Sequence, residues 1–210
     1  MIRLGISVEG YTEEAFVRNV LADHLRQNGV EPYPIVIGRA RSGGRGGGNV
    51  SVRRLVNDIV KLHYSYDAVT SLVDFYGFRD REESTVELLE ERLGDEIAPK
   101  LKNRRWVMPY VQKYEFEGLL FSKAEAFHVI GKTANPNIER LLAIRQKFST
   151  PEDINDDTAP GKRIEEAVSG YRKRLHGPMI ARETGLPKIR AECPRFNAWA
   201  TCLEGLAGQI

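Results

Sequence analysis

Acidic residues follow three predicted strands of this sequence, each at the point where a strand ends. These residues are Glu9, Asp74, Glu115 and Glu117. Ligands of open parallel sheets bind beyond the carboxyl ends of the strands, so we expect the four carboxylates to gather at one edge. Carboxylates within a few ångströms raise each other's pKa unless a cation neutralises them. Mg²⁺ and Mn²⁺ prefer such hard oxygen ligands, and the pattern therefore predicts a divalent-metal site.

Each of these acids also has a purely structural explanation. An acid such as Glu9, close to the start of a helix, stabilises that helix by about 0.3–1 kcal/mol. Asp74 stands before an aromatic turn, where its side chain could form an Asx-turn. Glu115 and Glu117 share one face of an extended segment while their neighbours pack. The coincidence of three strand ends favours a site over these separate explanations.

Strands that alternate with helices must position these acids. Apolar patterning predicts strands at 2–8, 34–37, 68–73 and 106–111. This order of elements indicates βαβ units and an α/β fold with a central, mostly parallel sheet. Residues 1–125 are interpreted as this core, and residues 126–210 as a helical extension that packs on it within one compact unit.

Capping residues and glycines set the expected bounds of the helices. The first helix should begin with Thr12 as its N-cap and end at Asn28-Gly29. A second should run from the N-cap Ser51 through His63, and a third from Glu82 to about Ala98. In the second half, Pro160 and Gly161 should open a further helix, which brings Lys162 and Arg163 to its first turn.

The charge of the chain makes no argument for nucleic acid by itself, because 31 basic residues face 29 acidic ones. Residues 161–195, however, hold nine basic and four acidic side chains, an excess that attracts a polyanion. The alternative is a solvated helical surface. Two cysteines exclude a disulfide framework, and no apolar run approaches the ~20 residues that span a bilayer. We therefore expect a cytoplasmic protein without a membrane segment.

Two segments are candidates for contact with phosphate. Lys162 and Arg163 at a helix start would offer backbone N–H groups and a cation, unless they are only a surface pair. The glycine-rich segment 38–49 lacks the Gly-Lys-Ser/Thr ending of a P-loop. With Arg45 and its neighbouring arginines, this segment could bind the phosphates of a nucleic-acid backbone. The alternative is a mobile loop near the active edge.

The residues around Glu9 carry a resemblance to a known family. Val8 to Glu13, VEGYTE, resembles the start of TOPRIM domains, particularly those of the OLD nucleases. TOPRIM domains hold Mg²⁺ with a glutamate after the first strand and an Asp-x-Asp after a later one. The resemblance implies that Glu9 and Asp74 are catalytic metal ligands. Tyr76 stands where the second aspartate belongs, so Glu115, Glu117 or Asp80 would have to replace it.

Further segments resemble a small stand-alone TOPRIM-like family of unknown function, often encoded beside an ABC- or AAA-type ATPase. They are YEFEGLLFS at 114–122, PEDIN at 151–155, APGKRI at 159–164 and IRAECPRFNAW at 189–199. The resemblance implies a Mg²⁺- or Mn²⁺-dependent nuclease acting on DNA or RNA in phage defence or a toxin-like system, with an ATPase partner. By the same resemblance Lys162 would be the late catalytic lysine of OLD nucleases.

Two other interpretations remain open at this stage. The chain could be a non-catalytic metal-binding partner module of the ATPase, since its Asp-x-Asp is incomplete. It could also transfer phosphoryl groups on nucleotides rather than on polymeric DNA or RNA.

Overall fold

A computed structural model describes residues 1–38, 50–81, 84–101, 106–155 and 158–209. The chain divides into two compact units. Unit 1 contains Met1–Gln112 together with Thr201–Ile210, and unit 2 contains Lys113–Ala200. A mostly parallel sheet with many helices confirms the α/β class predicted from the sequence.

Unit 1 is built on a parallel sheet whose strand order is β2-β1-β3-β4. The strands are β1 (Ile2–Val8), β2 (Val30–Val36), β3 (Ala68–Asp74) and β4 (Trp106–Met108), and a short β5 (Val111–Gln112) pairs with the end of β3. In register, Val8 of β1 lies beside Val36 of β2 and Leu72 of β3. The carboxyl ends of these three neighbouring strands therefore meet at one edge, as parallel pairing requires.

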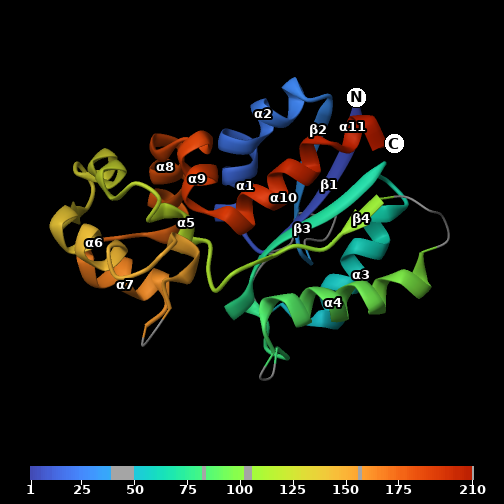
Figure 1. Ribbon diagram of the computed structural model, residues 1–210, viewed down its shortest axis with the longest axis horizontal. Coiled ribbons are helices and arrows are strands. Elements are labelled where there is room, and N and C mark those ends of the chain that lie inside the picture. Colours follow the sequence, from blue (N-terminus) through green and yellow to red (C-terminus); the bar gives the residue numbers. More distant parts are fainter. Residues whose placement is uncertain (39–49, 82–83, 102–105, 156–157, 210) are drawn as a thin grey trace. The chain divides into compact units, whose positions relative to one another are not determined.

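Helices cover both faces of this sheet. A continuous helical segment follows β1 and consists of α1 (Tyr11–Phe16), a π-helical stretch at Val17–Leu21 and α2 (Ala22–Gln27). The other helices of the α/β region are α3 (Val52–His63) and α4 (Val86–Ile97). Figure 1 shows α1 and α2 on one side of the strands and α3 and α4 on the other. Right-handed crossovers give this result, since the chain moves outward from β1 to β2 and back to β3.

Several sequence predictions for unit 1 are confirmed. The first strand has the predicted bounds, and α3 begins after Ser51, whose side chain accepts a hydrogen bond from the Arg54 backbone N–H at 3.3 Å. β3 is buried throughout, as its apolar sequence indicated. The predicted strand 34–37 corresponds only to the end of a longer strand, which begins at Val30 and ends at Val36.

Other predictions for unit 1 are corrected by the structure. The N-cap of the first helix is Gly10 rather than Thr12, which lies buried inside its first turn. α4 begins at Val86, where Thr85 accepts a hydrogen bond from the Leu88 backbone N–H at 3.3 Å. The predicted start of this helix, Glu82, lies outside the described residues.

The predicted strand 106–111 is interrupted at Pro109, which has no N–H to donate to a ladder. Side chains of neighbouring elements take over the hydrogen bonds there. Ser71 of β3 donates to the Tyr110 carbonyl at 2.9 Å and accepts from the Tyr110 N–H at 3.0 Å. The N–H of Val111 donates to the Glu90 carboxylate of α4 at 2.7 Å. The backbone groups at the interruption are therefore hydrogen-bonded to side chains nearby. The chain pairs with β3 again through β5.

Unit 2 is mainly helical, as expected for this part of the chain. Its elements are α5 (Glu117–Leu120), the 3-10 segment η4 (Ala124–Ile130), α6 (Ile138–Arg145), the 3-10 turn η5 (Pro151–Asp153), α7 (Pro160–Ala167), α8 (Lys173–Thr184) and α9 (Leu186–Glu192). Two short strands, β6 (Asn135–Pro136) and β7 (Val168–Ser169), form an antiparallel pair. Among the described residues, no helix is both long enough and apolar enough to cross a membrane.

One helix belongs to both units by sequence. α10 (Pro194–Glu204) begins among the residues of unit 2 and ends among those of unit 1, where the short α11 (Leu206–Gln209) follows it. Leu203 and Leu206 are fully buried, and Glu204 contacts His24 of α2. The last residues of the chain therefore complete the unit that its first residues begin.

Candidate functional site

The carboxyl ends of β1 and β3 bring two of the predicted acids together in unit 1. The Glu9 carboxylate accepts a hydrogen bond from the Asp74 backbone N–H at 3.3 Å. The Glu9 backbone N–H in turn lies 3.4 Å from the carbonyl of Leu72 on β3. Asp74 is 5 % exposed, whereas Glu9 is half-buried. The pair therefore joins two adjacent parallel strands at the edge where ligands of such sheets bind.

Gly77 leaves the space that the Glu9 carboxylate occupies. Three residues after Asp74, the chain passes so close to Glu9 that a Cβ at position 77 would collide with the carboxylate oxygen. The φ angle of Gly77 is not left-handed, so the requirement for glycine is one of space rather than of backbone conformation. This close approach fixes the position of Glu9 against the 75–77 turn.

A third acid near this edge was not singled out from the sequence. Glu13 of α1 is 3 % exposed, and its carboxylate lies 3.3 Å from the position that a Cβ at Gly10 would take. The sequence signal was its position four residues after Glu9, whereas its neighbour Glu14 forms an ordinary helix ion pair with Arg18 at 3.0 Å. We refer to Glu9, Glu13 and Asp74 as the acidic edge.

The residues after Asp74 form an aromatic and cationic cluster. The Arg81 guanidinium lies over the ring of Tyr76 at 5.1 Å from its centroid and over the ring of Phe75 at 5.8 Å. Asp80, the alternative ligand, accepts the Val52 backbone N–H with both carboxylate oxygens at 3.1 Å. Asp80 therefore stabilises the start of α3, and the residue two positions after Asp74 is an aromatic ring that packs under a cation.

The other two predicted acids lie together in unit 2. Glu115 accepts the Gly161 backbone N–H at 2.7 Å, at the start of α7. Glu117 is 1 % exposed and accepts a hydrogen bond from the Lys173 ammonium group at 2.8 Å. A Cβ at Gly161 would lie 2.9 Å from a Glu115 carboxylate oxygen and 3.6 Å from the Cγ of Glu117. Both glutamates therefore converge on the first turn of α7.

A cavity of about 280 Å³ in unit 2 is lined by these glutamates and by other polar residues, which we call the polar cavity. Its lining residues are Glu115, Glu117, Ala159, Gly161, Lys162, Glu165, Tyr171 and Lys173. The hydroxyl of Tyr171 is buried and has no hydrogen-bond partner among the described residues. Burial, and next the negative charge of Glu117, raises the pKa of this phenol far above its usual range, so it stays neutral. The cavity thus combines carboxylates, ammonium groups and a neutral phenol.

The two predicted pairs of acids fall in different units, and one metal site that uses all four stays a prediction. Within the described ranges, no group of three or more histidine, cysteine, aspartate or glutamate residues is arranged to hold a metal ion. The Glu9–Asp74 pair offers two carboxylates. Mg²⁺ binds proteins through one or two carboxylates and keeps several of its waters, so such a pair fits this ion.

The candidate phosphate contacts have different surroundings. Lys162 is exposed on the first turn of α7, at the polar cavity. Arg163 donates to the Thr158 carbonyl at 2.8 Å and lies over the Phe148 ring at 5.4 Å, a structural position. Glu115 already occupies the Gly161 N–H that a phosphate would use. Arg45 lies outside the described residues.

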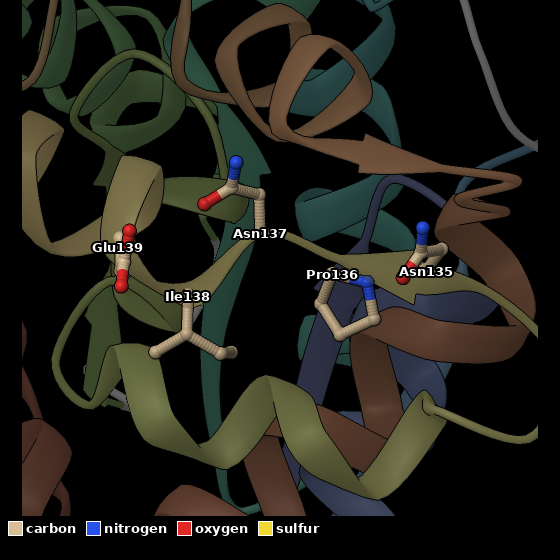
Figure 2. A pocket seen from close by; sticks show the side chains of 5 residues that line it. All are labelled: Asn135, Pro136, Asn137, Ile138 and Glu139. Atoms are coloured by element: carbon tan, nitrogen blue, oxygen red, sulfur yellow. The ribbon is translucent and has the colours of Figure 1, made fainter.

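Figure 2 shows a second hollow of unit 2, of about 370 Å³, at the start of α6. It is lined by five consecutive residues, Asn135, Pro136, Asn137, Ile138 and Glu139. The Asn137 side chain accepts the Arg140 backbone N–H at 2.9 Å and so serves as the N-cap of α6. A single acid and no base line this hollow, so it lacks the opposed charges of the polar cavity.

The sequence segments that resemble the TOPRIM-like family are joined by polar contacts within unit 2. Glu152 of the PEDIN segment is 3 % exposed and accepts the backbone N–H groups of Arg195 and Phe196, at 2.8 and 3.0 Å. Glu152 therefore accepts hydrogen bonds from two N–H groups in the first turn of α10, which have no partner within the helix itself. Ser122 lies 3.3 Å from the thiol of Cys193, whose pKa burial raises far above its usual range. This thiol is consequently protonated and structural.

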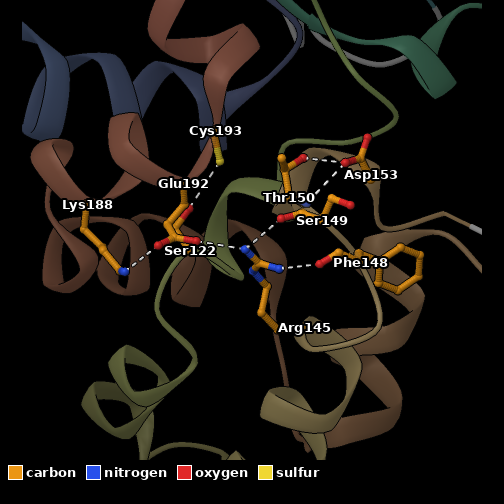
Figure 3. A network of polar contacts seen from close by, with 9 residues as sticks. All are labelled: Ser122, Arg145, Phe148, Ser149, Thr150, Asp153, Lys188, Glu192 and Cys193. Atoms are coloured by element: carbon orange, nitrogen blue, oxygen red, sulfur yellow. Dashed lines mark hydrogen bonds and ion pairs between the residues drawn. The ribbon is translucent and has the colours of Figure 1, made fainter.

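A neighbouring network joins α6, α9 and the turn before η5 (Figure 3). Arg145 of α6 pairs with Glu192 of α9 at 2.8 Å and also donates to the carbonyls of Phe148 and Ser149, at 2.7 and 3.4 Å. Thr150 and Asp153 close a capping box at η5. The pair of Arg145 and Glu192 joins segments of unit 2 that are distant in sequence.

Comparison with known proteins gives one match. The family model described as "Domain of unknown function (DUF4276)" matches residues 8–204. No curated protein and no solved structure matches the chain. The matched span begins one residue before Glu9 and includes all four predicted acids and the lining of the polar cavity. The chain therefore belongs to the DUF4276 family.

Proposed function

We propose that the protein is a Mg²⁺- or Mn²⁺-dependent nuclease of the TOPRIM and OLD type, which hydrolyses phosphodiester bonds at the acidic edge of unit 1. The observation that carries this proposal is the Glu9 carboxylate bonded to the Asp74 N–H at the ends of adjacent parallel strands. The family resemblance of the VEGYTE segment supports the same assignment. Membership of the DUF4276 family does not bear on this assignment, because that family is described only as a domain of unknown function.

The residues of the acidic edge have separate roles in this proposal. Asp74 would hold the metal ion directly, and Glu9 would act as a second ligand or as a general acid or base beside the scissile phosphate. The buried Glu13 would hold the Glu9 segment in a negative environment that favours a cation. A bound divalent ion lowers the pKa of a water molecule and stabilises charge on the leaving oxygen.

The substrate and partner belong to the same proposal. The basic excess of residues 161–195 and the exposed Lys162 support contact with DNA or RNA. An ABC- or AAA-type ATPase partner, a role in phage defence or a toxin-like system, and a cytoplasmic location follow from the family resemblance. A catalytic role stays a prediction for Glu115, Glu117 and Lys162. These residues lie in unit 2, whereas the acidic edge belongs to unit 1.

A second candidate function is a non-catalytic metal-binding module that contacts the ATPase. The observation that favours it is Tyr76, which takes the place of the second aspartate and stacks under Arg81. A two-metal mechanism needs ligands for a second ion, and the described acidic edge offers a single pair of neighbouring strand-end carboxylates for it.

Cleavage assays with charge-matched variants separate the two functions. The protein is incubated with supercoiled plasmid, single-stranded DNA and single-stranded RNA, in Mg²⁺, Mn²⁺ or EDTA. We expect metal-dependent cleavage by the wild type and a loss of at least about 100-fold in Glu9→Gln and Asp74→Asn. The control is Asp23→Asn, which removes the same charge from a side chain that is 88 % exposed on α2.

Thermal unfolding with and without the ion gives an independent measurement. The wild type should melt at a higher temperature in Mn²⁺ than in EDTA, because an ion that binds only the folded state stabilises it. Both site variants should lose this rise, and Asp23→Asn should keep it. A wild type that shows the rise but never cuts supports the partner module. A wild type with neither property contradicts both candidates.

A further inference from the structure

A buried histidine in unit 2 uses both of its ring nitrogens. His176 of α8 is fully buried. Its Nδ1 accepts the Arg172 backbone N–H at 3.1 Å. Its Nε2 lies 3.1 Å from the Thr133 hydroxyl, which itself donates to the Ile130 carbonyl at 3.2 Å. Because the Thr133 hydrogen is directed to Ile130, Nε2 must be the donor, and the ring is neutral with its proton on Nε2.

The hydrogen bond from the Arg172 N–H to His176 ties the N-cap of α8 to the following turn of the helix. Arg172 is the N-cap of this helix, and its own side chain makes no capping hydrogen bond. His176 therefore reaches back one turn to the N-cap N–H, as the glutamate of a capping box does. The residue next to this N-cap on each side lines the polar cavity, Tyr171 before it and Lys173 after it. We call residues 171–173 the α8 corner.

We propose that protonation of His176 breaks its hydrogen bond to the Arg172 N–H, and that the α8 corner then changes conformation and displaces Tyr171 and Lys173 from the lining of the polar cavity. We call this device the His176 latch. The corner is closed while the hydrogen bond is present and open when it is broken. A protonated Nδ1 is a donor and cannot accept the Arg172 N–H, so the bond that closes the corner is lost. The imidazolium would also lie at the positive end of the α8 dipole. Both effects oppose protonation while the corner is closed and favour the open corner once the proton is bound.

The charges around His176 act in the same direction. The start of α8 carries Arg172, Lys173 and Arg174 and no acid in its first turn. Burial, and next the charge of Arg172, lowers the pKa of His176 below the ordinary 6.5. The ring of Tyr171, 5.8 Å from that of His176, keeps its neutral phenol.

Of the acids on the elements packed against α8, Glu117 offsets the charge of Lys173. On η4, both Glu125 and His128 are exposed to solvent. Glu117 of α5 is paired with Lys173. On α9, the Lys188 ammonium group is paired with Glu192 at 2.6 Å, and Arg190 donates to Asn197 at 2.7 Å.

The sign of the pH effect follows from the lowered pKa. A histidine whose pKa is lower in the closed state stabilises that state above pH 6.5, and this stabilisation is lost as the pH falls toward the lowered value. The open corner takes up a proton with an ordinary pKa. Its population relative to the closed corner should therefore rise as the pH falls from 7.5 to 5.5, by at most about tenfold.

Hydrogen exchange of the whole chain tests this latch. After correction for the intrinsic effect of pH, the amides of residues 171–176 should exchange faster at pH 5.5 than at 7.5, by up to about tenfold. The amides of α4, which contains no histidine, serve as the internal control. The matched variant is His176→Asn, which keeps an acceptor for the Arg172 N–H but takes up no proton in this range, and its corner should not respond to pH.

Two results would overturn the latch. One is a corrected exchange rate of residues 171–176 in the wild type that is equal at the two pH values. The other is a pH response of His176→Asn as large as that of the wild type. If this variant does not fold, nitrogen chemical shifts of the wild-type imidazole decide, because a proton on Nδ1 at pH 7.5 contradicts the proposed hydrogen bonds.

Discussion

At the scale of single residues, the two pairs of acids have unlike surroundings. Glu9 follows β1 and Asp74 is the last residue of β3, so their meeting could be predicted from strand ends alone. The partners of Glu115 and Glu117 could not, because Gly161 and Lys173 are distant in sequence and are brought near by helix packing. Likewise, the sequence shows that Glu13 can stabilise a helix start, but burial of its carboxylate depends on how α1 packs.

The Lys173–Glu117 pair yields a prediction at this scale. Replacing Lys173 by methionine leaves the buried Glu117 carboxylate without its charged donor, so the free energy of unfolding should fall by about 1–3 kcal/mol. Lys188→Met, which breaks an exposed pair with Glu192, should cost less than about 1 kcal/mol. Urea unfolding of the two variants measures both values.

The double variant Lys173→Met/Glu117→Gln checks the cause of this loss. If the uncompensated carboxylate causes it, adding Glu117→Gln should restore part of the stability. A double variant whose loss equals the sum of the two single losses would show that the ion pair contributes nothing of its own.

At the scale of elements, local signals were sufficient where the element depends on its own residues. Alternation of apolar residues predicted the bounds of β1, and the cap Ser51 predicted the start of α3. The bounds of an element were predicted wrongly where they depend on backbone geometry or on residues distant in sequence. Gly10 rather than Thr12 caps α1, and the π-helical stretch at Val17–Leu21 has no sequence signal that we recognise. The strand predicted at 106–111 ran through Pro109, where β4 and β5 are in fact separated, and the side chains that satisfy this break come from β3 and α4.

The start of α3 yields a prediction at this scale. Two side chains satisfy its first turn, Ser51 at the Arg54 N–H and Asp80 at the Val52 N–H. Ser51→Ala should lower the free energy of unfolding by about 1 kcal/mol, the usual effect of losing an N-cap. Asp80→Asn keeps an acceptor but loses the charge at the helix start, so we expect a smaller loss of about 0.3–1 kcal/mol. If both variants unfold at the wild-type urea concentration, the caps contribute nothing.

At the scale of the whole molecule, the division into units depends on contacts between distant parts of the chain. The sequence division at residue 125 relied on a change in the type of element. The assignment of residues 201–210 to unit 1 depends instead on which helices the end of α10 and α11 contact, and local sequence patterns carry no such information.

These last residues yield a prediction for unit 1. Leu206 of α11 is fully buried, so Leu206→Ala should lower the free energy of unfolding by roughly 2–5 kcal/mol. Thr201→Ala changes an exposed residue of α10 and should stay within about 0.5 kcal/mol of the wild type. Chemical denaturation of both variants makes the comparison. A Leu206→Ala protein as stable as Thr201→Ala would mean that the final helix does not support the unit.

The path of α10 also has a consequence for synthesis on the ribosome. Domains generally fold as units in the order in which they are translated. Here the sheet strands emerge first, yet Leu203 and Leu206 of the same unit are translated only after the whole of Lys113–Ala200. The apolar core of unit 1 therefore lacks these two leucines until the whole of unit 2 has been translated. Folding of unit 1 can consequently be completed only after unit 2 has been synthesised.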